Sequence, residues 1–435
     1  MRPVLTAAVV ALVLATGAAS AAPPQADARF TTFNASLNRP TKVPLDPVAN
    51  PTGVGLLTEQ LADPNVDDQY RRQAKNVAEV IQRVQPDVLL INEFDPLQDG
   101  DVGVSPGPEN LFRTNFLEEP QNDATPIEYP YAFIAASNTG VPTGKDLNGN
   151  GVVGATPGTQ AYGDDSYGFG LHPGHFGMVV FSKYPIDYAN VRTFRLFKWK
   201  DMPGNLIPTP FYSPDEVAIL RLSSKSHWDV PIQIGGKTVH FLVSHPTPPV
   251  FDGPEDRNGR RNHDEIRFWA DYISPGKSGY IYDDAGVHGG LKAGELFVIA
   301  GDQNSDPLDG DSVPGSIQQL IEHPLVNTKQ TPASVGAIEA TALQGGANTS
   351  HKSDPQFDTA DFADSAPGNL RADYVLPHKA LQLVDAGVFW PLQSDPLFRL
   401  TGVFDTTFSI WNLVGGFPTS DHRSVWIDVT LPSVK

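Results

Sequence analysis

The chain has 435 residues and a formal net charge of −19 at pH 7, and 40% of its residues are hydrophobic. This length and composition are typical of a globular protein with a sizeable core. The acidic excess argues against non-specific adhesion to nucleic acid or anionic membranes as the main task. Phosphate-ester hydrolysis remains open, because a metal ion can supply local positive charge. Cysteine is absent, so any metal must be held by oxygen or imidazole ligands rather than thiolates.

Residues 1–21 have the features of a secretory signal peptide. Arg2 precedes an apolar run over residues 4–15, and Ala19-Ser20-Ala21 forms a small-residue cleavage pattern. The run is short for a bilayer-spanning helix, which makes a membrane anchor the weaker alternative. No later stretch reaches the length of a transmembrane segment, and no obligate protein partner is evident. We therefore expect residues 22–435 to form a single catalytic domain, secreted or periplasmic after cleavage.

The clearest helix signal lies between residues 67 and 84. Its apolar residues recur at three- and four-residue steps and form one stripe: Tyr70, Ala74, Val77, Ile81 and Val84. Acidic residues precede this stripe and Pro86 ends it. A short apolar strand at 88–91 follows, and Asn92-Glu93 comes directly after it. A helix that returns the chain to a strand ending in a carboxylate is typical of a layered α/β domain.

Polar residues also mark the boundaries of several other apolar strands. The strands are expected near 28–34, 178–186, 239–246, 296–304, 370–377 and 420–429. The polar residues at the boundaries are Asn34, Glu93, His245, Asp302, Asn304, Asp373, Asp421 and His422. A single polar strand end is usually an ordinary loop. If these strands form two packed sheets, however, the C-terminal ends of some strands and the N-terminal ends of others can lie at one rim. The polar residues at these ends would then lie close together.

The residue types in this set indicate metal-assisted chemistry. Carboxylates and amides are hard oxygen donors suited to magnesium, manganese or calcium, and magnesium takes few carboxylates together with water and phosphate oxygens. Glu93 is therefore the first candidate for a metal ligand. The histidines and the remaining carboxylates are suited to proton transfer and to stabilising charge on a phosphate.

The ordered motifs carry a resemblance to a known family. Asn34 is followed by the segments INEFD, GMVVFSKYPI, SHP, GDQN, DYVLP and SDHR. This order and spacing resemble the endonuclease/exonuclease/phosphatase superfamily, which includes pancreatic-type deoxyribonucleases, abasic-site endonucleases, inositol polyphosphate phosphatases and bacterial sphingomyelinases. The resemblance covers nearly the whole chain after the signal peptide. It implies an α/β fold, a four-layered α/β sandwich with two facing mixed β-sheets flanked by helices, and a divalent-metal phosphoesterase site at one rim.

The resemblance also implies roles for the metal side of this site. Asn34 and Glu93 look like the metal-binding end, with Asp421 close enough to ligate the ion or to orient a water molecule. Asp302 is similar to the residue that positions or deprotonates the attacking water. Asn304 is similar to the residue that holds this water and the phosphate in place.

The remaining roles concern the phosphate. His422 resembles a histidine that lies against the scissile phosphate, and Asp373 resembles the carboxylate that orients this imidazole. His245 resembles a second phosphate-facing histidine. Whether Asp302 or His422 takes the proton from water is left open. Tyr184, in SKYP, is a candidate phosphate contact, with packing beneath the site as the alternative.

Two segments depart from the shortest family members, residues 96–176 and the arginine-rich residues 255–273. Residues 96–176 are expected to be an insertion that shapes a substrate wall or a lid, and residues 305–370 an irregular surface excursion. The insertion contains Asp146, Asn148 and Asn150, which copy the first half of a calcium loop and suggest a structural Ca²⁺ site. Pro157 stands where such a loop needs a glutamate, so an ordinary hydrophilic loop is the alternative.

Arginines are concentrated just after His245, within residues 255–273. Arg257 and Arg261 are candidates for binding the substrate phosphate, because cations near a helix start are unfavourable unless an anion lies nearby. The alternative is that these arginines face water or pair with neighbouring acidic residues.

The sequence therefore predicts an exported phosphoester hydrolase that depends on Mg²⁺ or Mn²⁺. A nuclease-like phosphodiesterase is the first interpretation, with a phosphate ester as its substrate and nucleic acid among the candidates. A phosphomonoesterase acting on a small or headgroup-sized ester is the alternative. A non-catalytic binding module is disfavoured, because such a protein would be expected to have lost some of Glu93, Asp302 and His422, and all are present.

Overall fold

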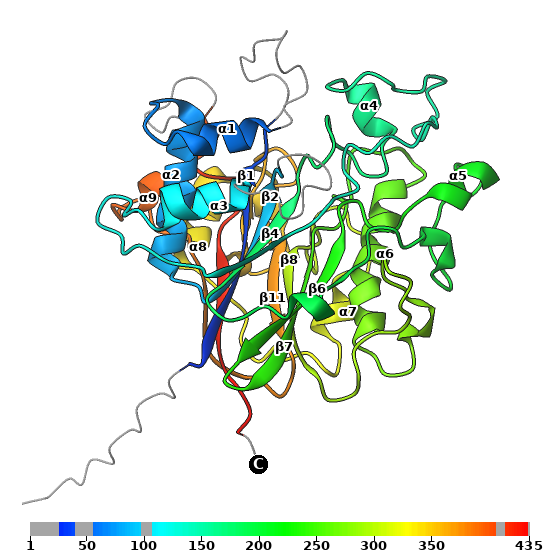
Figure 1. Ribbon diagram of the computed structural model, residues 1–435. Coiled ribbons are helices and arrows are strands. Elements are labelled where there is room, and N and C mark those ends of the chain that lie inside the picture. The colour runs from blue at the N-terminus through cyan, green and yellow to red at the C-terminus, as the bar shows by residue number, and fades with distance from the viewer. Residues whose placement is uncertain (1–25, 40–54, 97–106, 406–413, 434–435) are drawn as a thin grey trace, which may run out of the picture.

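The computed structural model describes residues 26–39, 55–96, 107–405 and 414–433 (Figure 1). The expected signal peptide lies outside these residues. Among the described residues, no helix is both long enough and apolar enough to cross a membrane.

The strands form two mixed sheets. The first contains β1 (Ala28–Leu37), β2 (Val88–Phe94), β3 (Tyr131–Ile134), β4 (Met178–Ser182), β12 (Gln382–Val388) and β13 (Val425–Thr430). The second contains β5 (Arg192–Thr193), β6 (His227–Ile234), β7 (Lys237–Ser244), β8 (Leu296–Asp302) and β11 (Asp373–Pro377). Their orders are β12-β13-β1-β2-β4-β3 and β11-β8-β7-β6-β5. Each sheet has one parallel pair, β1 with β2 and β7 with β8, and its other pairs are antiparallel.

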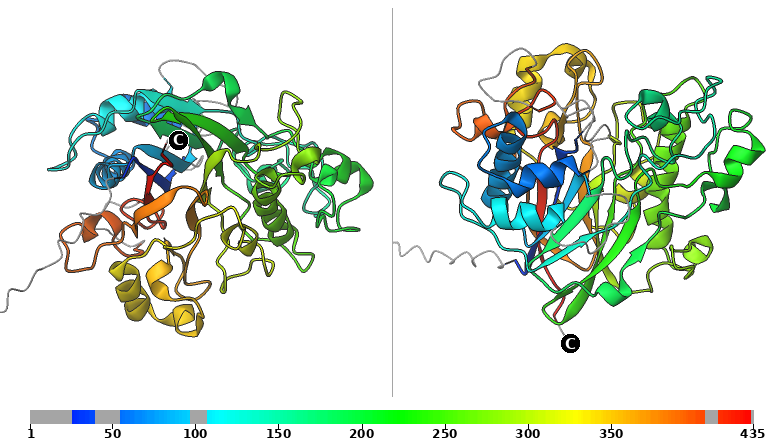
Figure 2. Two further views of the ribbon diagram at one scale, coloured as in Figure 1. Left: turned by 90° about the horizontal axis from the view of Figure 1, so that it is seen from below. Right: turned by 45° about the horizontal axis from the view of Figure 1, so that its top comes forward.

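Helices cover the outer faces of both sheets (Figure 2). Their bounds are α1 (Leu56–Ala62), α2 (Gln69–Val84), α3 (Pro108–Phe112), α4 (Gln160–Asp164), α5 (Pro214–Ile219), α6 (Arg257–Tyr272), α7 (Gln318–Ile321), α8 (Val335–Gln344) and α9 (Phe398–Thr401). Apolar residues of α1, α2 and α3 pack on the first sheet, and those of α6 and α7 pack on the second. These four layers confirm the fold class expected from the sequence.

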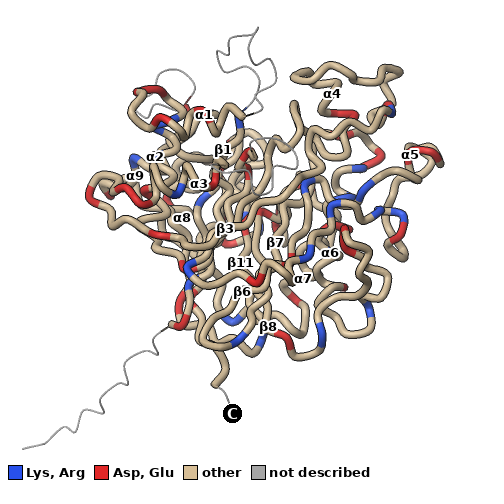
Figure 3. Tube along the Cα trace, viewed as in Figure 1, with Lys and Arg blue, Asp and Glu red and all other residues tan. Residues whose placement is uncertain are grey.

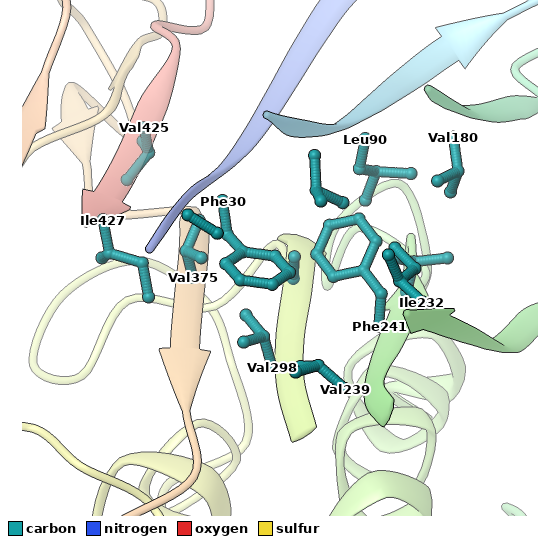
Figure 4. Close-up of a cluster of buried hydrophobic side chains, with 14 of the residues drawn as sticks. Phe30, Leu90, Val180, Ile232, Val239, Phe241, Val298, Val375, Val425 and Ile427 are labelled. Carbon is teal, nitrogen blue, oxygen red and sulfur yellow. The ribbon is translucent and has the colours of Figure 1, made fainter. Parts of the chain in front are cut away.

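The central core lies between the sheets (Figure 4). Because successive side chains of a strand point to opposite faces, Val88 and Leu90 of β2 enter this core, whereas Leu89 and Ile91 pack against the helices outside. β2 is therefore apolar on both faces, as a strand inside a layered fold must be. Phe30 of β1 meets Phe241 of β7 across the core, with ring centroids 5.6 Å apart.

The helix expected from the apolar stripe is α2. It begins after Asp68, whose carboxylate accepts the backbone N–H groups of Tyr70 and Arg71, as a helix N-cap does. It ends at Val84, before Gln85 with φ 54°. Local capping and burial of the stripe both place this helix against β2, and so they position the end of β2 at the rim.

The described parts of the segments 96–176 and 305–370 contain more regular structure than the sequence suggested. Residues 108–134 belong to the fold itself, since α3 and the π-helical turn at Arg113–Leu117 join the outer core and β3 extends the first sheet. The expected excursion at 305–370 contains α7, α8 and a small pair of strands, β9 (Ala360–Asp361) and β10 (Asn369–Leu370). Ala337 of α8 even reaches the central core. Strand β4 also ends at Ser182, earlier than expected.

Strand register brings the polar strand ends to one rim. Asn34 of β1 is level with Asn92 of β2, and Asp302 at the end of β8 is level with Asp373 at the start of β11. Parallel neighbours place their C-terminal ends at the same edge, and antiparallel neighbours place their N-terminal ends there. The predicted convergence at one rim of both sheets is therefore confirmed for these strands.

Candidate active site

Asn34 joins the two sheets at the rim. Its Nδ2 donates to Oε1 of Glu93 at 3.2 Å and to Oδ2 of Asp302 at 3.1 Å. Asn38 donates from its Nδ2 to the other carboxylate oxygen of Glu93 at 2.7 Å. Glu93 has φ 60°, which is rare for a non-glycine residue and is a form of backbone strain found at functional sites. The side chain of Glu93 is thus fixed by two amides and by an unusual backbone.

Asp302 lies at the centre of the cluster. Its Oδ1 accepts the backbone N–H of Asn304 at 2.8 Å. Its Oδ2 lies 3.4 Å from Nε2 of His245 and 3.6 Å from Nε2 of His422. The side chain of Asn304 donates to the carbonyl of Pro246 at 3.2 Å, which ties it to the loop after β7. One carboxylate therefore faces both candidate histidines.

His422 is oriented by a second carboxylate. Its Nδ1 lies 2.8 Å from Oδ2 of Asp373, and the same oxygen accepts a hydrogen bond from Thr359 Oγ1 at 2.8 Å. The ring of Phe362 packs edge-on against the imidazole, with centroids 5.3 Å apart. This arrangement leaves Nε2 of His422 as the nitrogen that faces Asp302.

Burial and charge set the protonation of these groups. Burial, together with the nearby Asp421, raises the pKa of Glu93 to about 7, and burial also raises the pKa of Asp302 to about 6. Burial lowers the pKa of His245 well below its usual value. Burial opposes the charge on His422 too, but Asp373 and Asp302 raise its pKa well above the usual value. These shifts favour a charged His422 and a neutral His245, and they make Asp302 a weaker acid than an ordinary aspartate.

The donor set fits a hard divalent cation. Glu93 and Asp421 repel each other, as the raised pKa of Glu93 indicates, and a bound cation would relieve this repulsion. Glu93, Asp421 and the carbonyl oxygen of Asn34 are all oxygen donors, as magnesium and manganese prefer. Asp302, Asp373 and His422 also lie close enough together to share an ion. One oxygen of Asp373 already accepts two hydrogen bonds.

A cavity of about 470 Å³ opens beside Glu93 and His245. Residues of the segment 147–176 form one wall and residues of α6 form another. The lining includes Leu147, Gln160, Gly163, Asp164, Ser166, Phe169, Phe176, Tyr212, Phe251, Arg257 and Arg261. The second half of the insertion therefore forms a wall of this cavity.

A second cavity, of about 690 Å³, borders Asp421 on another side of the cluster. Its lining combines aromatic rings with carboxylates from the segment 336–365 and from the chain around β12 and β13; they include Phe362, Trp390, Phe398, Phe404, Phe417, Glu339, Asp361 and Asp364. The catalytic cluster thus borders two cavities of different chemistry among the described residues.

The sequence reasoning missed Lys225, which lines the first cavity beside His245. The side chain is buried. Burial lowers its pKa, while Glu265, Glu93 and Asp302 act to raise it. A lysine in a serine-rich turn before β6 carries no motif, so only the fold reveals that its ammonium group lies near the carboxylates of Glu93 and Asp302.

The two candidate arginines differ in their roles. The guanidinium of Arg261 donates to the carbonyls of Leu222, Tyr167 and Arg221 at 2.8, 2.6 and 3.0 Å, so it ties α6 to two loops while it lines the cavity. Arg257 pairs with Glu255 and also lines the cavity. Figure 3 shows basic residues concentrated beside α6 in a chain otherwise richer in acidic residues. Pairing with a neighbouring acidic residue is thus observed for Arg257, and phosphate binding by either arginine stays a prediction.

Tyr184 does not belong to the cluster. It follows β4, whose Ser182 is level with Val88 at the start of β2, so Tyr184 lies at the opposite end of the sheet from Glu93. Its hydroxyl donates to the carbonyl of Asp27 at 2.8 Å. The expectation of a phosphate contact was wrong, because β4 runs antiparallel to β2 and carries its end away from the rim.

The calcium expectation is not supported. Both carboxylate oxygens of Asp146 accept backbone N–H groups, from Asn150 at 3.1 Å and Gly151 at 2.7 Å, and Asn148 accepts from the same Asn150 at 3.1 Å. Among the residues that the structure describes, no group of three acidic or imidazole side chains within metal-binding distance forms at this loop. The motif folds as a hydrogen-bonded turn in the wall of the first cavity.

A second cluster of potential metal ligands connects the insertion to the end of β2. It comprises Asp95, His172 and His175. Asp95 accepts the N–H of Phe176 at 2.9 Å and that of Arg39 at 2.6 Å, and Nε2 of His172 lies 3.2 Å from the Arg39 carbonyl. Since backbone groups already occupy this carboxylate, the group serves as a structural joint behind Glu93.

The four-layered sandwich and its carboxylate- and imidazole-bearing rim define a metal-dependent phosphoester hydrolase. The chain belongs to the Endonuclease/Exonuclease/phosphatase family, whose model matches residues 32–422. This match confirms the resemblance stated above and the enzyme class that it implied.

Solved structures resemble the chain at low sequence identity. An endonuclease/exonuclease/phosphatase from Beutenbergia cavernae DSM 12333 is 17% identical with a TM-score of 0.46, covering 94% of this chain and 72% of that one. Sphingomyelinase C from Streptomyces griseocarneus is 14% identical with a TM-score of 0.45, covering 92% and 98%. Beta toxin from Staphylococcus aureus with bound magnesium ions is 14% identical with a TM-score of 0.42, covering 92% and 99%. The search of curated proteins found no match.

Proposed function

We propose that the protein is a divalent-metal-dependent phosphodiesterase of nuclease-like type. The observation that supports a diesterase is that the catalytic cluster borders two cavities, one beside Glu93 and His245 and one beside Asp421. A phosphodiester carries a substituent on each side of its phosphate. A site with room on two sides suits such a substrate better than one with a single closed pocket.

Asp302 is the group proposed to take the proton from the attacking water. The raised pKa of His422 keeps its imidazole protonated at neutral pH, so it has no free electron pair for a base. With a pKa of about 6, Asp302 is ionised at pH 7 to 8 and suits general-base catalysis. Of the two bases that the sequence left open, we therefore propose Asp302.

His422 is proposed to donate a hydrogen bond from Nε2 to a phosphate oxygen, with Asp373 stabilising its charge. His245, on the cavity side, and Lys225 are placed to contact other phosphate oxygens. A bound Mg²⁺ or Mn²⁺ would supply further positive charge for the phosphate and would be held by Glu93, Asp421 and Asn34.

A phosphomonoesterase is the second candidate. It is favoured by the cations of the first cavity, Lys225, Arg257 and Arg261, because a monoester carries nearly two negative charges and rewards several cationic donors. Initial rates on bis(p-nitrophenyl) phosphate and p-nitrophenyl phosphate, measured with Mg²⁺ and with Mn²⁺, distinguish the two. We expect the diester to be hydrolysed faster, and a clear preference for the monoester would replace the first candidate by the second.

Matched variants test the roles proposed for Asp302 and His422. Asp302→Asn and His422→Ala should each lower kcat by about a hundredfold or more, whereas Tyr184→Phe, at the far end of the sheet, should leave it unchanged. Wild-type kcat in both cluster variants would remove these residues from the mechanism.

Export is part of the proposal. Secretion of the full-length chain, followed by mass determination of the mature N-terminus, tests it, and we expect cleavage after Ala21. Retention of residues 1–21 in the exported protein would favour an anchor instead.

A further inference from the structure

Phe251 is displayed at the mouth of the first cavity. It lies in the loop between β7 and α6 and lines the cavity, yet 87% of the residue is exposed. Its φ is 65°, a left-handed conformation that is unusual for a bulky aromatic residue. Exposure of the ring and the strained backbone both cost free energy, and both occur at the same residue beside the catalytic cluster.

The loop is held in this conformation by α6. The backbone N–H of Asn258 donates to Oδ2 of Asp252 at 2.6 Å, and the side chain of Asn258 donates to the carbonyl of Val250 at 2.6 Å. The residues on both sides of Phe251 are therefore fastened by one asparagine. The ring projects from an anchored loop, as expected of a preorganised contact surface.

The surroundings of the ring combine positive charge with flat apolar surface. Lys225 and Arg257 line the same cavity, and so does the phenyl ring of Phe176, whose centroid lies 6.4 Å from that of Phe169. Cations inside the cavity suit a phosphate, while an exposed ring at its mouth suits a planar group attached to that phosphate. The volume of about 470 Å³ is in the range of pockets for single small molecules.

We propose that Phe251 is a stacking surface for a nucleobase, and that the first cavity binds the nucleotide unit on one side of the scissile phosphate. This inference rests on the proposed function, since it names the substituent that the diesterase takes at this cavity. Aromatic side chains stack on any base, because every base has a π-face. The cavity then recognises the size and planarity of the base and does not distinguish one base from another.

Insertion of Phe251 into a lipid surface is the competing use of an exposed ring. A membrane contact needs a broad apolar surface, and it is opposed at anionic surfaces by the net charge of −19. Phe251 instead lies on a cavity whose lining includes three cations, Lys225, Arg257 and Arg261. The nucleotide is therefore the occupant that the lining favours.

Calorimetric binding of adenosine 5′-monophosphate and of ribose 5-phosphate, both with Mg²⁺ present, tests the inference. The two ligands share the phosphate and the sugar and differ in the base. We expect the wild-type protein to bind the nucleotide about tenfold more tightly, and Phe251→Ala to reduce this ratio to about twofold or less. Phe251→Trp should retain the preference. Tyr188→Ala, which removes another exposed aromatic ring outside the cavity lining, should leave it unchanged.

Equal affinity for the two ligands in the wild-type protein would overturn the inference, and so would an unchanged ratio in Phe251→Ala. Loss of sedimentation with phosphatidylcholine vesicles in Phe251→Ala, with the nucleotide ratio unchanged, would assign the ring to a membrane instead. The proposed diesterase activity and the proposed base-binding site can be refuted independently. Base preference without any diester hydrolysis would refute the diesterase and keep the binding site, whereas hydrolysis without base preference would do the reverse.

Discussion

Glu265 of α6 holds the two loops that carry Lys225 and His245, and its substitution by glutamine is the sharpest test of how the site is positioned. The carboxylate is fully buried. Its Oε1 accepts the backbone N–H of Ser224 and its Oε2 accepts that of Thr247, each at 2.6 Å. Because the two donors belong to residues next to Lys225 and two positions after His245, one side chain sets the separation of both groups.

The loss of stability expected for Glu265→Gln follows from these contacts. One charge-assisted hydrogen bond is lost, worth about 1.5–3 kcal/mol, and a buried backbone N–H is left facing an amide NH₂ group, which costs about 1–3 kcal/mol more. We expect the free energy of unfolding to fall by about 2.5–6 kcal/mol. Displacement of His245 by even about 1 Å would lower kcat by roughly a hundredfold.

Urea unfolding and diester hydrolysis measure the two effects. Glu265→Asp, which keeps the charge on a shorter side chain, should recover part of both losses. Glu322→Gln is the matched control, because Glu322 is exposed and should tolerate the change. Wild-type stability together with wild-type kcat in Glu265→Gln would refute the view that this carboxylate positions the site.

Three further predictions concern the metal, the arginines and a buried carboxyl group. Chelation should abolish hydrolysis and Mg²⁺ or Mn²⁺ should restore it, whereas Glu93→Gln should remain inactive at millimolar metal; full activity of a chelated sample would contradict a metal role. Arg257→Ala should raise KM with little change in melting temperature, while Arg261→Ala should lower the melting temperature because three carbonyls lose their donor; equal melting temperatures in the two variants would contradict this division. Burial raises the pKa of Asp358 from 3.8 to about 8, so its stabilising contribution is complete below pH 4 and is lost as the pH rises through 8. Asp358→Asn should therefore stabilise the protein at pH 9, by at most about 5 kcal/mol, and far less at pH 5, and a pH-independent difference in urea unfolding would disprove the assignment.

Much of the fold could be predicted because local and global signals agree. The apolar stripe of α2, its cap at Asp68 and the continuous apolar run of β2 each specify an element and its burial without reference to the rest of the chain. The rim could be predicted because a strand end is visible in sequence as a change from apolar to polar residues. Asp302 and His422, which follow this pattern, were found in that way.

Residues without such a pattern could not be predicted. Lys225 and Asn38 reach the cluster only because the register of the sheets brings their loops to the rim, and no spacing in the sequence encodes this. Tyr184 was wrongly expected in the site for a different reason. Its SKYP motif is recognisable in the sequence, but β4 runs antiparallel to β2, so the residues that follow β4 lie away from the rim. Strand direction depends on contacts far apart in the chain, which periodicity does not reveal.

The buried carboxylates also explain how a chain without cysteine holds long loops in place, and Asp165 provides the last test. It is buried in the insertion, and its two oxygens accept the backbone N–H groups of Leu147 at 2.8 Å and Gly154 at 2.7 Å. The pair of bonds fixes both ends of the turn that contains Asp146, and so it fixes the wall of the first cavity. Asp165→Asn removes one of the two acceptors, so we expect faster amide hydrogen exchange at Leu147 and Gly154 and a higher KM, with kcat nearly unchanged because the catalytic cluster belongs to other elements. Glu128→Gln, at an exposed residue of the same insertion that does not line the cavity, is the control. Unaltered exchange at both amides would show that the wall is held by other contacts, whereas a fall in kcat without a change in KM would place Asp165 in the catalytic machinery rather than in the wall.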